Sequence, residues 1–410
     1  MRRLILLAFI LSALNWQACR TLDGIPVGLA QEFGALLVSS NVDSARIFID
    51  LNRRGDFADT GKMTRIDEAV RLDSLPVGLH ALRLQRSCYT TGQDEFEVAI
   101  SAQGEANLNA PMQLLPDAAG LVLLSTPDSA LVFLDGLPQG YTPLTLTCLD
   151  VGAHLVEFRK GSYAPDTMAV TLTGGALDTL SRPLSLQRTV LMEHFSSSTC
   201  IPCVEADEII ESVGLQAGPA AVAAIGYHTE IPSSGDPMFL AARADNDARI
   251  EYYNVFTNPI VYIDGLVPEL GVTNLRNRLN EEIDIRAAIN PPLTLEFFDY
   301  RVGADSLSGR IRLEALQPLS GAFLRVAIVE KNIDYQNPPG SNGQTHFIDV
   351  LRAFWPEPRG TSLTMNAGEK RFVPFAVPLN SAWISGQLEV VAFVQVGSHE
   401  ILQAASTQYP

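Results

Sequence analysis

The chain has 410 residues, and a typical domain size of about 150 residues predicts two to four structural units. Hydrophobic residues make up 47% of the sequence and charged residues 18%, which is the composition of a globular protein and argues against a disordered one. The formal net charge of −17 repels phosphate groups, so we expect no nucleic-acid partner.

The N-terminal residues have the pattern of an export signal. Two arginines precede an apolar run from Leu4 to Leu14, which is shorter than the roughly 20 residues of a membrane-spanning helix. A basic start, a short apolar core and a small residue before the break are typical of a secretory signal peptide, here residues 1–18. Ala18-Cys19 resembles the lipobox of bacterial lipoproteins, which implies a lipid anchor on Cys19. Cleavage at another position, without a lipid, is the alternative.

The region before residue 190 contains an internal repeat. Residues 43–50 and 128–135 share one motif, and residues 75–80 and 149–154 share another, with a longer middle in the first unit. Within each unit apolar residues alternate with polar ones, and this period of two predicts half-buried β-strands.

The second unit resembles PEGA domains, which are small β-sandwich modules of bacterial envelope proteins. The first unit is a degenerate copy that lacks the Asp-Gly turn and the Thr-Pro-Leu element. The resemblance implies two PEGA-like β modules, at residues 34–115 and 118–187, that act as non-catalytic spacers or binding units. It rests on Ser125-Thr126-Pro127, Leu134-Asp135-Gly136, Thr142-Pro143-Leu144 and Lys160-Gly161.

Two cysteines, Cys88 and Cys148, lie at non-matching positions of the two repeat units. A bridge between them would require the modules to pack face to face. We therefore favour two buried free thiols over a bridge.

A Cys-x-x-Cys pair follows the repeats. Thr189–Phe195 is an apolar strand pattern, a polar loop comes next, and residues 204–211 have helical spacing with acids in the first turns. Cys200 and Cys203 thus lie at a strand-to-helix junction, where the helix N-terminus lowers a thiol pKa. This placement favours thiol–disulfide exchange, with Cys200 as the attacking thiolate and Cys203 as the resolving thiol. A permanent structural disulfide is the alternative.

The downstream elements follow the order of the thioredoxin-like fold. A buried strand at 220–227, a helix at 240–253, a strand at 260–263 and a helix at 273–288 are expected. The resemblance implies an α/β domain over 188–289, with a cis-proline at Pro259 that shapes a substrate groove beside the cysteines.

Thioredoxin-like proteins commonly carry a buried acid six residues before the first cysteine. This chain has His194 at that position, with Glu193 beside it, and either side chain could carry protons. Strand alternation lets only one of them face the cysteine helix. For His194 a packed structural histidine is the alternative.

A more specific resemblance covers about residues 188–406, to the Omp28-related outer-membrane proteins of Bacteroidota-type bacteria. It implies a C-terminal β-sandwich at 293–408 and a place in the cell envelope, but no particular reaction. The matching segments are Val190–Ser196 before the cysteine pair, Gly226–His228, Tyr252–Val255 before Asn258-Pro259, Val329–Ile333, Asn342-Gly343, Val350–Arg352 and Val390–Gln395.

These patterns together predict a multidomain α+β protein. Its expected parts are two small PEGA-like β-sandwich modules, a thioredoxin-like α/β domain and a C-terminal β-sandwich. We expect an outer-membrane lipoprotein that faces the periplasm or the cell surface, without a metal or other cofactor. Two functions stay open: thiol–disulfide exchange on envelope proteins as clients, which would make the chain an oxidoreductase, or a non-catalytic binding or structural role.

Overall fold

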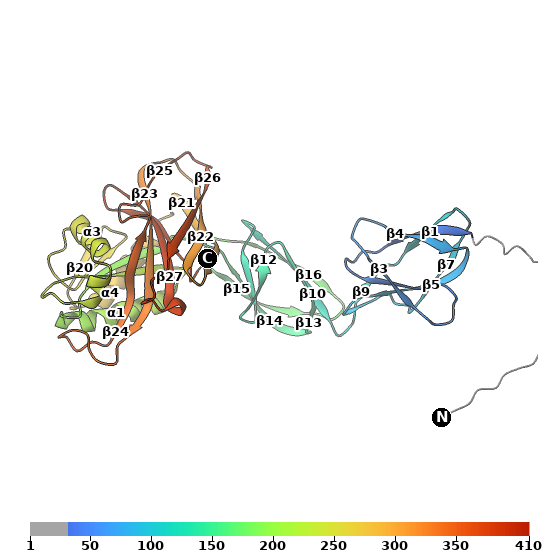
Figure 1. Ribbon diagram of the computed structural model, residues 1–410, viewed down its shortest axis with the longest axis horizontal. Helices are drawn as coiled ribbons and strands as arrows, with labels where there is room; N and C mark the ends of the chain where they lie inside the picture. Colours follow the sequence, from blue (N-terminus) through green and yellow to red (C-terminus); the bar gives the residue numbers. More distant parts are fainter. Residues whose placement is uncertain (1–31, 410) are drawn as a thin grey trace, which may run out of the picture. The chain divides into compact units, whose positions relative to one another are not determined.

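The structure, a computed structural model, describes residues 32–409. Within that range the chain contains 28 β-strands and four α-helices, and it divides between Leu115 and Pro116 into two units (Figure 1). The signal peptide predicted at residues 1–18 and the lipid anchor predicted at Cys19 lie outside the described residues. In the described range no helix is both long and apolar enough to cross a bilayer.

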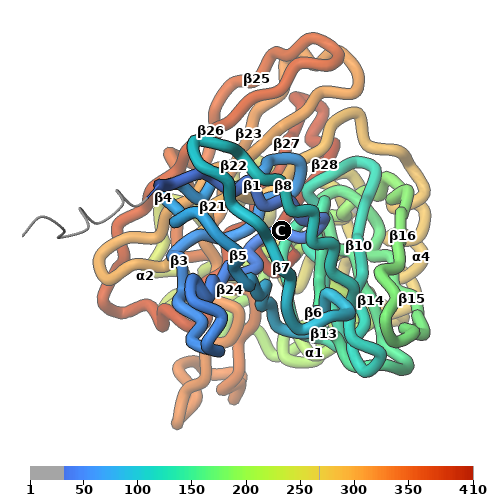
Figure 2. The backbone as a smooth tube through the Cα atoms, turned by 90° about the vertical axis from the view of Figure 1, so that its right-hand side faces the viewer, coloured from blue at the N-terminus to red at the C-terminus, as the bar shows by residue number. Residues whose placement is uncertain are grey.

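The first unit, blue to cyan in Figure 2, is a small two-sheet β structure. Its strands are β1 (Phe33–Ser39), β2 (Arg46–Asp50), β3 (Ala58–Met63), β4 (Val70–Pro76), β5 (Gly78–Gln85), β6 (Tyr89–Thr90), β7 (Phe96–Ile100), β8 (Glu105–Asn109) and β9 (Gln113–Leu114). One sheet has the order β4-β1-β8, the other has the order β3-β2-β5-β7, and β6 pairs with β9. Alternating apolar side chains of both sheets, among them Leu36, Ile47 and Leu82, form a single core.

The second unit begins with a similar β module. Its strands are β10 (Ala119–Thr126), β11 (Leu131–Leu134), β12 (Leu137–Tyr141), β13 (Leu144–Leu149), β14 (Gly152–Arg159), β15 (Asp166–Leu172) and β16 (Leu177–Pro183). They form sheets of order β13-β10-β16 and β12-β11-β14-β15 around a core that includes Leu121, Val132 and Phe158. In both modules the first strand pairs in parallel with a late one, β1 with β8 and β10 with β16. The sequence repeat therefore corresponds to a repeated β arrangement.

A nine-stranded sheet dominates the rest of the second unit. Its strands are β17 (Val190–Ser196), β18 (Val222–His228), β19 (Ile260–Ile263), β20 (Val267–Leu270), β23 (Leu319–Asp334), β24 (His346–Trp355), β25 (Thr361–Met365), β27 (Leu388–Val396) and β28 (Ile401–Ser406). The order is β20-β19-β17-β18-β24-β23-β27-β28, and β25 pairs with β23. Strand β18 joins β24 through one residue pair, Gly226 with Val350.

The helices cover both faces of β17. They are α1 (Ile201–Ala217), α2 (Pro237–Ala241), α3 (Arg243–Tyr253) and α4 (Leu275–Ala287), with a short 3₁₀ helix, η1 (Ser385–Gln387). Met192 of β17 belongs to one core with residues of α1 and α4, whereas Phe195 belongs to another core with Tyr253 of α3. This arrangement follows from strand alternation, which sends neighbouring side chains to opposite faces. Helix α1 ends before Gly218, whose φ of 78° suits a residue without a Cβ.

Three further strands form a second layer over the C-terminal part of the large sheet. They are β21 (Leu293–Val302), β22 (Ser306–Ala315) and β26 (Lys370–Pro378), in the order β21-β22-β26. Leu295, Ile311 and Phe375 of this layer share a core with Val326 and Val394 of the nine-stranded sheet.

The predicted fold class is wrong. The described residues form a multidomain, β-rich protein, and they contain no separate thioredoxin-like α/β domain followed by an independent C-terminal β-sandwich. The central and C-terminal strands instead continue as one sheet, and Phe195 and Tyr227 share a core with Val329 and Phe393. Alternation in a sequence marks where strands lie, but it does not identify the strands that pair with them.

Candidate functional site

The cysteine pair forms a disulfide at the start of α1. Cys200 is the N-cap residue, Cys203 lies in the first turn, and their sulfur atoms are 2.02 Å apart. The backbone N–H of Cys203 donates to the carbonyl of Cys200 at 3.2 Å. Cys200 is 2% exposed and Cys203 is 0% exposed. The pair therefore stands at the predicted strand-to-helix junction, but in a buried position.

A segment between β23 and β24 lies on the loop that carries the cysteines. The Asn342 side chain donates to the carbonyl oxygens of Ser197 at 3.2 Å and Cys200 at 3.1 Å, and its backbone N–H donates to Ser198 O at 3.1 Å. A Cβ atom on Gly340 would lie 2.1 Å from that same Ser198 oxygen. Residues 340–342 thus cover the loop so closely that only glycine fits at position 340.

A buried carboxylate holds the cysteine loop from the other side. Asp236 accepts hydrogen bonds from the backbone N–H of Ser198 at 2.6 Å and of Phe239 at 2.9 Å, and it contacts His228 Nδ1 at 2.9 Å. Burial opposes its ionisation, but the charge of His228 and these donors outweigh burial and lower the pKa of Asp236 to about 2. The loop is therefore anchored by a charged carboxylate over the whole physiological pH range.

His194 is the residue that faces the cysteine helix. Its Nδ1 atom lies 3.7 Å from Asp207 Oδ1 of α1. The other side of the ring packs closely on Gly226, where an added Cβ atom would lie only 2.7 Å from His194 Nε2. Neither ring nitrogen has a hydrogen-bond partner among the described residues. Asp207 in turn accepts from Ser196 at 3.0 Å and from Gln344 at 2.9 Å.

Glu193 lies on the opposite face of β17, toward α3. It accepts from Tyr227 at 2.7 Å and from Tyr253 at 2.5 Å, and it pairs with Arg249 at 2.5 Å. Burial and the charge of Glu193 raise the pKa values of both tyrosines well above the ordinary value. The described contacts of Glu193 join α3 to the sheet and do not reach the cysteines, so the geometry ties Glu193 to packing rather than to proton transfer at Cys200.

Pro259 follows a cis peptide bond, as the resemblance implied. The side chain of the preceding Asn258 donates to Thr229 Oγ1 at 2.6 Å and to Ile231 O at 2.9 Å. Thr199, next to Cys200, donates to Ser233 O at 3.1 Å. The residues that precede Pro259 and Cys200 therefore both donate hydrogen bonds to one loop, residues 229–236.

The other two described cysteines differ from the expectation. Neither Cys88 nor Cys148 is a free thiol in the structure. The expectation of two free thiols is therefore wrong.

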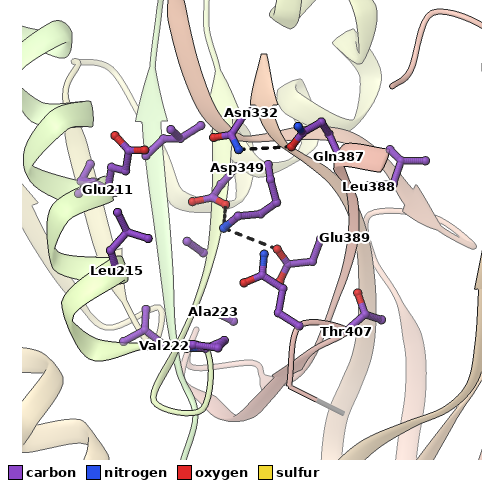
Figure 3. A pocket seen from close by; sticks show the side chains of 18 of the residues that line it. Glu211, Leu215, Val222, Ala223, Asn332, Asp349, Gln387, Leu388, Glu389 and Thr407 are labelled. Carbon is purple, nitrogen blue, oxygen red and sulfur yellow. Dashed lines mark hydrogen bonds and ion pairs between the residues drawn. The ribbon is translucent and has the colours of Figure 1, made fainter. Parts of the chain in front are cut away.

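The sequence patterns did not identify a polar cavity on another part of the large sheet. Lys331, Asp349 and Glu389 meet in a cavity of about 540 Å³ that α1 helps to line (Figure 3). The three residues lie on β23, β24 and β27. Each of the three strands carries more than one polar residue, so the sequence offered no signal that singled out Lys331, Asp349 and Glu389 before the strands were known to be neighbours.

Comparison with known proteins identifies one part of the chain. Residues 119–189 match the PEGA domain family, which confirms the PEGA resemblance predicted for residues 118–187. The match does not include the first unit. No curated protein matches the chain.

Several solved structures resemble parts of the fold at low similarity. HBP35 of Porphyromonas gingivalis is 14% identical, with 54% of this chain and 75% of that chain covered and a TM-score of 0.44. The Bacillus anthracis TIE protein is 9% identical, with 40% and 36% covered and a TM-score of 0.21. GBS52, the minor pilin of Streptococcus agalactiae, is 10% identical, with 37% and 96% covered and a TM-score of 0.17. TM-scores this low do not establish a shared overall fold.

Proposed function

We propose that the chain is an exported, non-catalytic protein of the bacterial cell envelope, in which the PEGA domain and the large β unit act as binding and structural modules. In this proposal the Cys200–Cys203 bond is a structural disulfide. The observation that carries this proposal is the burial of both cysteines, at 2% and 0% exposure, beneath the segment that contains Asn342.

Burial matters because disulfide exchange requires direct attack of a thiolate on a sulfur atom, so its rate depends on access. Asn342 and Gly340 cover the cysteine loop on one side, and Asp236 holds it on the other. A client thiol would have to displace these contacts before it could react. The arrangement favours a bond that persists over one that turns over.

The disulfide also supports the proposed location. Disulfides persist mainly in oxidising compartments such as the periplasm and the cell surface, and PEGA domains occur in envelope proteins. The export pattern of residues 1–18 agrees with this location, and the lipid anchor at Cys19 would hold the protein to the membrane. We expect the partners to be other envelope components that bind without covalent chemistry.

An insulin-reduction assay tests the proposal. The mature chain, supplied with dithiothreitol, should reduce insulin no faster than its Cys200→Ser variant, because a buried pair offers no accessible thiolate. The matched measurement is alkylation of the two cysteines after mild dithiol treatment, which should leave most of the pair unmodified. Cysteine-dependent turnover, or rapid and complete alkylation, would contradict the proposal.

Thiol–disulfide exchange is the second candidate, and one observation favours it. Cys200 occupies the N-cap of α1 and makes no side-chain capping hydrogen bond, so the helix N-terminus would stabilise a thiolate there once the bond is reduced. This function requires the segment with Asn342 to move away from the cysteine loop, and the two candidates therefore differ in the behaviour of that segment.

A further inference from the structure

The cavity around Lys331 arises from the way two halves of the large sheet meet. Strands β18 and β24 share one residue pair, Gly226 with Val350. Val222, at the start of β18, and Asp349, beside that pair on β24, both line the cavity (Figure 3). A sheet with a continuous ladder would have no such space between its strands, so the cavity is built into the junction.

Apolar and polar side chains both line the cavity, with Glu211 beside Leu215 on α1 and Leu388 beside Gln387 on the opposite side (Figure 3). Leu215 of α1, Val222 of β18 and Leu388 of β27 supply apolar surface, while Asn332 and Gln387 supply amide groups. Leu215 is 77% exposed, so it lies at the open side. This combination suits a ligand with an apolar chain and one strongly polar end.

Within the cavity two buried carboxylates share one ammonium. Asp349 is 5% exposed and Glu389 is 4% exposed. Lys331 Nζ contacts Asp349 Oδ1, but it stays 3.6 Å from Glu389 Oε2, beyond hydrogen-bond distance. Among the described residues no direct hydrogen bond reaches that Glu389 oxygen, although Lys331 forms an ion pair with it and both Lys331 and Ser406 act against burial to lower the pKa of Glu389. A buried carboxylate oxygen without a hydrogen bond is costly, and here it faces a cavity that has room for a donor.

The titration of Glu389 agrees with this shortage of positive charge. Burial raises the pKa of Glu389 to about 7, and the attraction of Lys331 only partly offsets the effect. One ammonium is therefore too little to keep two neighbouring buried carboxylates fully ionised.

We infer that this cavity binds an organic cation, a primary ammonium group on an apolar chain, with the ammonium against Glu389 and the chain against Leu215 and Val222. The site is separate from the cysteine pair, so the inference goes beyond the proposed function and does not depend on it. A free alkylamine and a lysine side chain of a peptide both present this chemistry.

The charges around the cavity oppose the other ligand classes. Glu211 faces the cavity from α1, Asp349 from β24 and Glu389 from β27, against one cation, Lys331 from β23. An anion would be repelled by this excess of negative charge. A metal ion would need several converging ligands, and the described part of the chain has no group of three His, Cys, Asp or Glu side chains that could hold one.

Calorimetry on the whole mature chain tests the inference. Hexylamine titrated at pH 8 and low salt should bind with one site per chain, and 1-hexanol should bind at least about tenfold more weakly, because it lacks the charge-assisted hydrogen bond. N-acetyl-lysine methylamide is the second arm. If it binds as well as hexylamine, a peptide side chain is the ligand source, and if only hexylamine binds, the source is a small amine. No binding of either amine, equal binding of the alcohol, or displacement of the amine by calcium would overturn the inference.

Two variants and a pH series locate the binding. Glu389→Gln should weaken hexylamine binding at least about tenfold, whereas Glu281→Gln, the same change at an exposed position on α4, should leave binding unchanged. Since Glu389 is buried, Glu211→Gln at the mouth of the cavity provides a variant with little risk to folding, and it should weaken binding about twofold to threefold. Full affinity in both cavity variants would refute the site.

The pH series needs no variant. The charged and titratable groups that line the cavity are Lys331, Asp349, Glu389, Glu211 and Tyr300. His346 lies 3.5 Å from Glu211. Glu389, with a pKa of about 7, titrates between pH 6 and pH 8. Burial opposes the charge of His346, but Asp334 and Glu211 outweigh burial and raise its pKa, so loss of its proton changes the charge in the same direction. Hexylamine stays protonated over that interval, as lysine does. Affinity should therefore rise several-fold from pH 6 to pH 8, and a flat profile would refute the role of Glu389.

Discussion

Glu193 and His194 are neighbours in the sequence with opposite environments. Glu193 is held by Arg249 and two tyrosines on the α3 side, whereas His194 faces Asp207 of α1 and has no hydrogen-bond partner among the described residues. Strand alternation predicts that only one of them reaches the cysteine helix. The structure identifies His194 as that residue. Its role in proton transfer stays a prediction, since a packed histidine fits the same contacts.

Asp236 sets a pH dependence at the residue scale. Its pKa falls from 3.8 to about 2 in the folded chain, so its stabilising effect is present above about pH 4 and is lost as the pH falls through 2. The lowered pKa corresponds to a contribution of about 2 kcal/mol to the free energy of unfolding. Asp236→Asn should lower the free energy of unfolding at pH 7 by about that amount, and the difference from the unmodified chain should shrink toward pH 2. Urea denaturation at several pH values measures this, and a difference that stays constant with pH would contradict it.

At the scale of elements, the cover on the disulfide is the decisive arrangement. The cover comes from the connection between β23 and β24, more than 130 residues after the cysteines in the chain, and Asn342 makes three hydrogen bonds to the cysteine loop. Two elements that the sequence separates widely thus form one local structure. The contact reaches the backbone of the loop that carries the buried cysteines.

Asn342→Ala removes the side-chain part of the cover. We expect the Cys200–Cys203 bond to be reduced by dithiothreitol about thirtyfold faster, because each of the two lost hydrogen bonds makes local opening easier by about 1 kcal/mol. Rates of thiol appearance, followed by alkylation and mass spectrometry, measure the effect. Asn277→Ala, on α4 and exposed, is the control and should leave the rate unchanged. An unchanged rate in Asn342→Ala would show that other contacts limit access.

At the scale of the whole molecule, the central strands and the C-terminal strands form one continuous structure. They share the nine-stranded sheet and the core that joins Phe195 and Tyr227 to Val329 and Phe393. The sequence pattern changes between residues 289 and 293, where we expected a domain boundary. Strands from both sides of this point nevertheless pack in the same sheet and the same core.

Truncation tests this continuity. A chain that ends at residue 290 removes β23, β24, β27 and β28, which exposes the apolar face of β18 and leaves its edge unpaired. We expect this fragment to lose the cooperative thermal transition of the region after residue 188, as measured by near-UV circular dichroism and calorimetry. A fragment that melts cooperatively at the temperature of the full chain would show that the central region folds alone.

Local patterns in the sequence determined the local features of this protein. They include the strands of both repeat modules, the PEGA domain at 119–189, the strand-to-helix placement of Cys200, and the cis bond before Pro259. Residue spacing was sufficient for the strands and for the placement of Cys200, whereas the PEGA domain and the cis bond were implied by family resemblance; each of these features depends on residues close together in the chain.

Only the tertiary structure decided which elements meet. It placed Asn342 over the cysteine pair, joined the central strands to the C-terminal strands, and brought Lys331, Asp349 and Glu389 from three strands into one cavity. Strand pairing and burial depend on contacts between distant segments, and many pairings are compatible with the same alternating pattern. The physical reason is that the free energy of these arrangements resides in packing between elements, which a single stretch of sequence does not contain.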